Sequence, residues 1–196
     1  MTTTTQIPDL RPLLLDALGV VDGLVATVTP TDLDRPTPCS DFAVRGLLDH
    51  LVMVVRRVRV VLTGGHFTDV PQVSGLADDE LAGAFSDGLA VLRTTLPDVD
   101  LTALATAPFG TVPNAAALAS YVGEVLVHGW DLARALDRTD LLRPALAEPV
   151  VEPASRRLPR EGREGLPFGE VVEAPADADA LERLVAWMGR DPRWRP

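Results

Sequence analysis

Apolar residues recur at helical spacing in four long parts of the chain. These segments span residues 10–28, 40–65, 78–96 and 114–136. In each of them, side chains three or four positions apart are apolar, so one face of a helix would be buried. No segment has the alternating pattern of a long strand. The pattern therefore predicts an all-α fold, a four-helix bundle.

Capping and breaking residues mark the ends of these segments. Ser40 or Asp41 is placed to cap the second helix, and Asn114 is placed to cap the fourth. The Gly64–Gly65 pair is expected to end the second helix, and Pro97 is expected to close the third.

The helical pattern weakens after residue 140. Prolines interrupt this part of the chain at positions 144, 149, 153 and 159. Only short helical pieces are therefore expected there. Residues 169–174 (GEVVEA) predict a short strand. Asp177 or Asp179 is placed to cap a last short helix that stops at Gly189. We expect a bundle of residues 1–140 and a proline-rich C-terminal extension of residues 141–196, packed on the bundle and not an independent domain.

The composition excludes several classes of function. A net charge of -10 argues against a nucleic-acid partner, because such binding depends on clustered basic residues. All 18 basic residues are arginine, and without lysine the chain can form neither a Schiff base nor an ordinary P-loop. No apolar run approaches the roughly 20 residues that span a bilayer. The N-terminal segment lacks the features of a signal peptide, so we expect a cytoplasmic protein with no membrane partner.

Cysteine and serine chemistry is not favoured either. Cys39 is the single cysteine, which excludes an internal disulfide and any site with several thiolates. We expect it to be a small buried apolar residue. A serine nucleophile is disfavoured because the chain contains no G-x-S-x-G motif.

Charged residues interrupt the apolar pattern of the fourth helix. Glu124 and His128 are four positions apart, so they share one face, with Tyr121 one turn before them and Asp131 one turn after. Small and aliphatic residues surround this face, and burying unpaired polar groups is costly. One explanation is a simple hydrogen bond between Glu124 and His128. The other is that both bind a cation.

A residue of the second predicted helix supports the explanation that these side chains bind a cation. His50 lies at the edge of its apolar stripe, so two imidazoles and one carboxylate would converge from two helices. This set matches a divalent-metal site with open coordination positions, with zinc as the expected metal and nickel or iron as alternatives. His66, in a loop, is kept as an alternative to His50.

Three further side chains have expected roles near this set. Asp131 would hold an imidazole N–H, or it would form a salt bridge with Arg134 or Arg138. Tyr121 is the candidate catalytic residue, as a nearby proton donor. Trp130 and Trp187 are expected to be core aromatics and not part of a substrate site.

The same residues carry a family resemblance. The chain resembles the DinB-like, metal-binding bundle family that includes mycothiol-dependent maleylpyruvate isomerase. The resemblance rests on the segments RPTPCSDFAVRGLLDHL, APFGTVP, EVLVHGWDLARA and LERLVAWMGRDP. It implies a four-helix core and a metal held by His50, Glu124 and His128, with water completing the coordination. It also implies mycothiol as a cosubstrate whose thiol pKa the metal lowers.

The chain departs from this family at two points. It has Phe42 where members usually carry tryptophan. The isomerase also has a separate C-terminal domain that contributes arginines to its substrate site, and the residues after the bundle are too few to form it. We therefore expect an activity other than maleylpyruvate isomerisation.

Three hypotheses for function follow. The leading one is a metal-dependent enzyme that acts on a small molecule, as a thiol-dependent transferase or isomerase. The alternative is a noncatalytic protein that binds or sequesters a small molecule in the same bundle. The third is an interaction module that forms a homodimer through a helix face.

Overall fold

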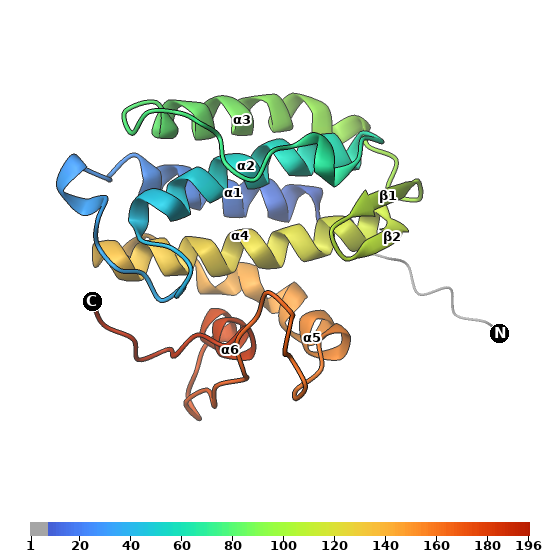
Figure 1. Ribbon diagram of the computed structural model, residues 1–196. Coiled ribbons are helices and arrows are strands. Elements are labelled where there is room, and N and C mark those ends of the chain that lie inside the picture. The colour runs from blue at the N-terminus through green and yellow to red at the C-terminus, as the bar shows by residue number, and fades with distance from the viewer. Residues whose placement is uncertain (1–7) are drawn as a thin grey trace.

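The structure, a computed structural model that describes residues 8–196, is mostly helical. Four long helices form a bundle in which α1 packs against α3 and α4, and α2 packs against the same two helices (Figure 1). Their bounds are α1 Arg11–Val25, α2 Val44–Leu62, α3 Leu81–Thr95 and α4 Asn114–Leu136. The prediction of an all-α four-helix bundle is confirmed.

Helices α2 and α4 run in opposite directions, and this antiparallel pairing fixes which residues meet. At one end, the Asn114 side chain donates a hydrogen bond to the Leu62 carbonyl oxygen, 3.2 Å away. Further along, His50 meets Glu124. The pairing therefore places the second half of α2 beside the first half of α4.

The predicted N-caps of α2 and α4 are wrong. Helix α2 begins after Ala43, and the preceding loop satisfies its first N–H groups: Val44 donates to the Arg35 carbonyl oxygen at 3.0 Å and Arg45 to that of Leu33 at 2.9 Å. Neither Ser40 nor Asp41 is therefore needed as a cap. Asn114 is already helical, and its side chain bonds to carbonyls of other segments.

A short hairpin precedes α4. Strands β1 (Leu104–Ala107) and β2 (Gly110–Pro113) pair antiparallel, with Ala107 opposite Gly110. Pro108 and Phe109 form the turn between them. The sequence pattern predicted only a loop here, because four-residue strands are too short for a clear alternation.

The C-terminal extension contains α5 (Glu148–Arg157) and α6 (Ala180–Trp187), both of which pack against α4 (Figure 1). Its buried side chains belong to the same hydrophobic cluster as the bundle, including Ala147, Val150, Leu181, Leu184 and Val185. Asp179 caps α6 by accepting a hydrogen bond from the Glu182 N–H at 2.8 Å. Gly189 follows with a φ of 84°, as a helix end requires.

The strand predicted at residues 169–174 does not form. Val172 donates its N–H to the Ala186 carbonyl oxygen near the end of α6, at 3.0 Å. No second strand lies beside this segment to complete a ladder in the part of the chain that the structure describes.

Residues 1–7, which contain most of the segment examined for a signal peptide, lie outside the described residues. Among residues 8–196, no helix combines the length and the apolar character needed to cross a membrane.

Candidate functional site

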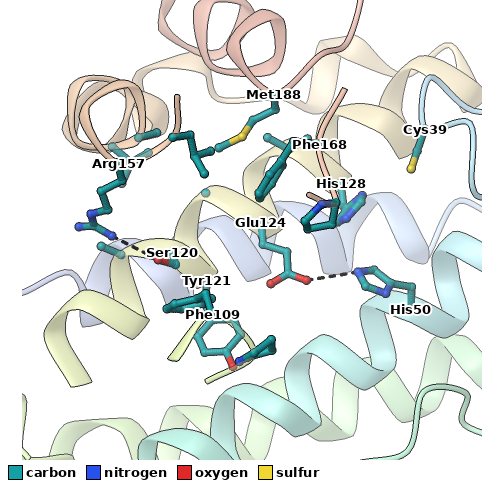
Figure 2. Close-up of a pocket in the computed structure, with 18 of the residues that line it drawn as sticks. Cys39, His50, Phe109, Ser120, Tyr121, Glu124, His128, Arg157, Phe168 and Met188 are labelled. Atoms are coloured by element: carbon teal, nitrogen blue, oxygen red, sulfur yellow. Dashed lines mark hydrogen bonds and ion pairs between the residues drawn. The ribbon is translucent and has the colours of Figure 1, made fainter. Parts of the chain in front are cut away.

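The structure brings His50, Glu124 and His128 together. One donor atom from each of the three lies within 4.8 Å of the other two. His50 Nε2 lies 3.3 Å from Glu124 Oε1, and the two imidazole rings are 4.8 Å apart between centroids (Figure 2). Helix α2 supplies the first side chain and α4 the other two, as the helical spacing predicted.

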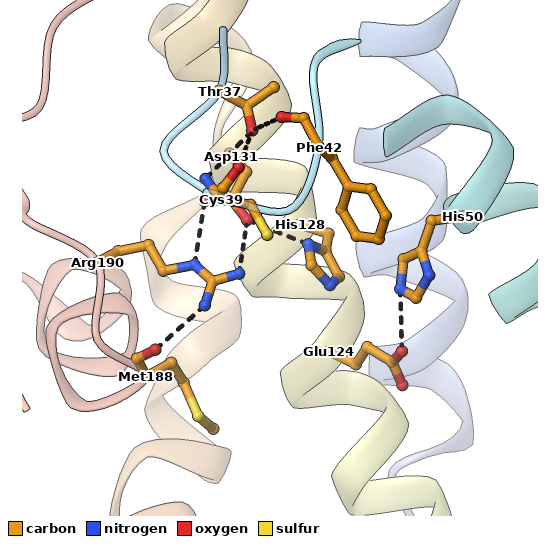
Figure 3. A network of polar contacts seen from close by, with 9 residues as sticks. All are labelled: Thr37, Cys39, Phe42, His50, Glu124, His128, Asp131, Met188 and Arg190. Carbon is orange, nitrogen blue, oxygen red and sulfur yellow. Dashed lines mark hydrogen bonds and ion pairs between the residues drawn. The ribbon is translucent and has the colours of Figure 1, made fainter. Parts of the chain in front are cut away.

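His128 is held in place by a buried ion pair. Its Nδ1 lies 3.1 Å from Asp131 Oδ2, and Arg190 Nη2 lies 3.2 Å from the same oxygen (Figure 3). Because Asp131 is fully buried and paired with Arg190, it acts as an acceptor and His128 Nδ1 donates. The proton is thereby kept on Nδ1, and Nε2 has a free lone pair.

Of the two roles predicted for Asp131, the contact with an imidazole is the one observed. Its arginine partner is Arg190, from the C-terminal extension, and not Arg134 or Arg138. Arg134 lies over the Trp130 ring, and Arg138 pairs with Asp140.

His50 has a stacked aromatic ring and an unsatisfied nitrogen. The Phe42 ring stacks on its imidazole with 5.0 Å between centroids, so Phe42 contacts the site directly. The approach of Nε2 to Glu124 lacks the alignment of a hydrogen bond, and this buried nitrogen has no hydrogen-bond partner among the described residues. Buried polar atoms normally have a hydrogen-bond partner. The lack of one at His50 Nε2 is consistent with a nitrogen that binds a metal ion.

The local charges keep Glu124 ionised. Desolvation acts to raise the pKa of its carboxyl group, but His50, His128 and Arg57 outweigh this effect and hold the pKa below its ordinary value. Two imidazoles and one carboxylate, all near a cavity wall, form a donor set that suits a divalent cation.

These side chains line a cavity of about 580 Å³. The bundle forms one wall, the hairpin contributes Phe109, and the extension contributes Val150, Phe168 and Met188. Figure 2 shows Phe168 and Met188 of the extension on the side of Glu124 and His128 away from α2. A mostly apolar cavity of this size with a few polar groups is typical of small-molecule sites.

Tyr121 also lines the cavity and is almost fully buried. Burial raises the pKa of its phenol well above the ordinary value, and the charge of Glu124 raises it further. Its hydroxyl has no hydrogen-bond partner in the described part of the chain. The group therefore stays protonated at neutral pH and can donate a hydrogen bond.

Besides Arg190, the cavity lining contains polar residues for which the sequence indicated no site role, among them Cys39, Arg57 and Arg157. Cys39 is buried as predicted, but its sulfur also lies within 4.8 Å of donor atoms of His128 and Asp131. Burial raises the pKa of its thiol. Arg57 lines the cavity from α2, and Arg157 lines it from α5. Arg57 follows His50 by seven positions, so the helical period was a signal that it shares the same face.

His66 and two of the tryptophans lie elsewhere. His66 is exposed, and its Nδ1 accepts a hydrogen bond from the Thr68 N–H at 3.2 Å. The structure therefore does not bring it to the donor set in place of His50. Trp130 is a core residue as predicted, whereas Trp187 is half-buried beneath Arg163. Neither ring lines the cavity.

Comparison with known proteins places this chain in a family. The sequence profile of the mycothiol maleylpyruvate isomerase N-terminal domain matches residues 14–133, more than half of the chain. The chain belongs to this family. The matched range contains His50, Glu124, His128 and Asp131, but it ends before Arg190.

Individual proteins also resemble this chain. Uncharacterized proteins of Mycobacterium tuberculosis strains CDC 1551 / Oshkosh and ATCC 25618 / H37Rv are each 29% identical over 173 residues, covering 87% of this chain and 91% of theirs. Two crystal structures share its fold: mycothiol-dependent maleylpyruvate isomerase (TM-score 0.54, 15% identity) and a point mutant of it (TM-score 0.57, 14% identity). Each match covers 64% of this chain, and the chain spans 60% of the length of those structures.

Part of the cavity of this family member is lined by residues outside the range 14–133 that matches the family. Val150, Phe168, Met188 and Arg190 all follow residue 133. The donor set thus lies in the part that the family defines, while the opposite wall comes from the extension.

Proposed function

We propose that this protein is a metal-dependent enzyme that acts on a small molecule, as a transferase or isomerase that uses a thiol such as mycothiol. The observation that carries the proposal is the convergence of three donor atoms, from His50, Glu124 and His128, within 4.8 Å on a cavity wall. Zinc suits this donor set, and nickel or iron would suit it too.

A cation bound there would lower the pKa of a thiol or polarise a carbonyl group. The chain's own residues prepare the site for it. Asp131 and Arg190 fix the orientation and the tautomer of His128, and Phe42 packs on His50. Such outer contacts orient ligands before an ion arrives.

The cavity would hold the substrate away from bulk water. Its apolar walls remove competing hydrogen bonds, which strengthens the polar interactions that remain. Tyr121, protonated at neutral pH, would donate to an oxygen of the substrate one helical turn from Glu124.

Metal analysis of the purified protein tests this proposal. We expect about one ion per chain, as in other sites of this ligand type. His50→Ala and His128→Ala should lose most of it, since each removes one of three protein ligands. His66→Ala is the matched control and should keep the wild-type content, because His66 is exposed and outside the donor set. Equal metal content in wild type and His128→Ala would contradict the proposal.

The largely apolar cavity wall is also what a protein that only binds a small molecule would have. Turnover separates the two functions. An enzyme consumes an electrophile in the presence of mycothiol and metal. A binding protein is stabilised by the electrophile, seen as a higher melting temperature, and releases it unchanged.

A further inference from the structure

Arg57 is a buried arginine that makes no hydrogen bond or close ion pair within the described part of the chain, residues 8–196. Only 8% of its surface is exposed. Its side chain lines the cavity described above. A guanidinium carries five donors, and no Arg57 nitrogen is among the fully buried atoms that lack a partner, so these donors are open to the cavity. An unpaired guanidinium facing a cavity therefore points to an anionic ligand.

The helix pairing places Arg57 within about one helical turn of Tyr121. Leu62 meets Asn114 and His50 meets Glu124, so residues midway along α2 lie level with the first half of α4. The electrostatics agree, because the charge of Arg57 acts to lower the pKa of both Tyr121 and Glu124.

Tyr121 contributes a second unpartnered group at this place. Its hydroxyl is buried and lacks a hydrogen-bond partner within the described chain, and the residue lines the same cavity. A guanidinium and a phenolic O–H that line the same cavity both have hydrogen-bond donors to offer, which is the complement of a carboxylate.

The other cationic groups of the cavity are already engaged. Arg190 is paired with Asp131, and Arg157 donates to Ser120 Oγ at 3.2 Å and to the Ala116 carbonyl oxygen at 3.3 Å. The carboxylates of the cavity are Glu124, in the donor set, and Asp41, which is exposed. Arg57 is thus the cavity arginine left free for a ligand among the described residues.

We propose that Arg57 and Tyr121 form a carboxylate-binding subsite beside His50, Glu124 and His128, and that this protein accepts small organic acids with an apolar body. The carboxylate would pair with the guanidinium and accept a hydrogen bond from the phenol, while the apolar body would lie against Phe109 and Phe168. This inference names a substrate class for the proposed function, and it depends on that function only for the reaction itself.

Calorimetric titration with matched acids and amides tests the subsite. The probes are benzoate, phenylacetate and hexanoate, each paired with its neutral amide, and each pair is titrated into protein with and without zinc. We expect at least one acid to bind about tenfold or more tightly than its amide, because charge-assisted hydrogen bonds are the stronger ones. Equal affinity within every pair, or binding of no probe, would overturn the proposal.

Substitutions show which residues cause the preference for acid over amide. Arg57→Met should abolish the preference for acid over amide, and Tyr121→Phe should weaken acid binding several-fold while leaving amide binding unchanged. Arg56→Met, one position along the same helix and outside the cavity lining, is the matched control and should behave like wild type. Arg57→Lys keeps the charge without the planar fork and should retain part of the preference, which gives a reading if the Met variant does not fold.

The outcomes separate this proposal from the proposed function. If His50→Ala abolishes the acid preference and Arg57→Met does not, a metal binds the acid and the subsite is wrong. If Arg157→Met alone abolishes the preference, the anion site belongs to α5 and the proposal is also wrong. If the protein binds no metal but the preference still depends on Arg57, the subsite stands and the metal-dependent function fails.

Discussion

At the scale of single residues, the close packing of α1 and α4 explains why a glycine, Gly129, lies inside the long helix α4. A Cβ built on it would lie 2.9 Å from Val21 Cγ2, so α1 and α4 approach each other closely at this point. By contrast, a Cβ at Gly123, in the same helix, would have no neighbour within 4 Å. The two glycines therefore differ in what they contribute.

Alanine substitutions at these two glycines should have opposite effects. Gly129→Ala should lower the free energy of unfolding by about 1–3 kcal/mol, because the methyl group overpacks the α1–α4 contact. Gly123→Ala should raise it by up to about 1 kcal/mol, because alanine favours the helix and the position has room. Urea denaturation of both variants measures the difference. A Gly129→Ala protein as stable as Gly123→Ala would show that the close approach is not needed.

The sequence predicted those site residues whose shared helix face follows from their spacing. Glu124 and His128 share a face because they are four positions apart, and His50 lies on the apolar edge of its own helix, so their convergence followed from two helices packing. Arg190 could not be found this way. It reaches Asp131 from 59 positions further along the chain, and no local period encodes that contact.

At the scale of the element, the irregular segment between α5 and α6 is organised around Arg163. This side chain is 2% exposed and donates to three carbonyl oxygens, those of Pro159 at 2.7 Å, Gly169 at 3.0 Å and Trp187 at 2.6 Å. Its guanidinium also lies over the Trp187 ring. One buried cation thus substitutes for the backbone pairing that this segment lacks.

Removing Arg163 should loosen the segment without unfolding the bundle. In Arg163→Ala, residues 158–170 should exchange their amide hydrogens faster, while α2 and α4 keep their wild-type protection. Arg160→Ala is the matched control, because Arg160 is exposed in the same segment and should leave exchange unchanged. Identical exchange in the two variants would contradict the role given to Arg163.

Helix positions were easier to predict from sequence than helix starts. The apolar stripes identified all four bundle helices, since burial of one face is a property of each segment itself. The caps at Ser40, Asp41 and Asn114 were wrong because carbonyl groups of Leu33 and Arg35 satisfy α2, and because Asn114 bonds to other segments. The cap predicted at Asp179 was correct because its hydrogen bond joins residues within a single helical turn.

At the scale of the whole molecule, the extension and the bundle share one hydrophobic core. Val150 of α5 and Leu184 of α6 are buried in the cluster that α1 to α4 form. We therefore propose that residues 141–196 do not fold separately from residues 1–140, and that the protein unfolds as one cooperative unit.

Tryptophan fluorescence in a Trp130→Phe variant tests this unit. The remaining tryptophans, Trp187 and Trp194, both report on the extension, while circular dichroism at about 222 nm reports mainly on the long bundle helices. The two signals should change at the same urea concentration. A fluorescence transition at lower urea would instead show that the extension unfolds independently.

The cavity wall opposite the donor residues has a different origin from the wall that holds them. Phe168 lies in irregular backbone between α5 and α6, and Phe109 lies in a two-residue turn, whereas His50, Glu124 and His128 project from regular helices. Irregular segments tolerate sequence change far better than packed helices. Substitutions in those two segments can therefore change the shape of the cavity while His50, Glu124 and His128 stay in place.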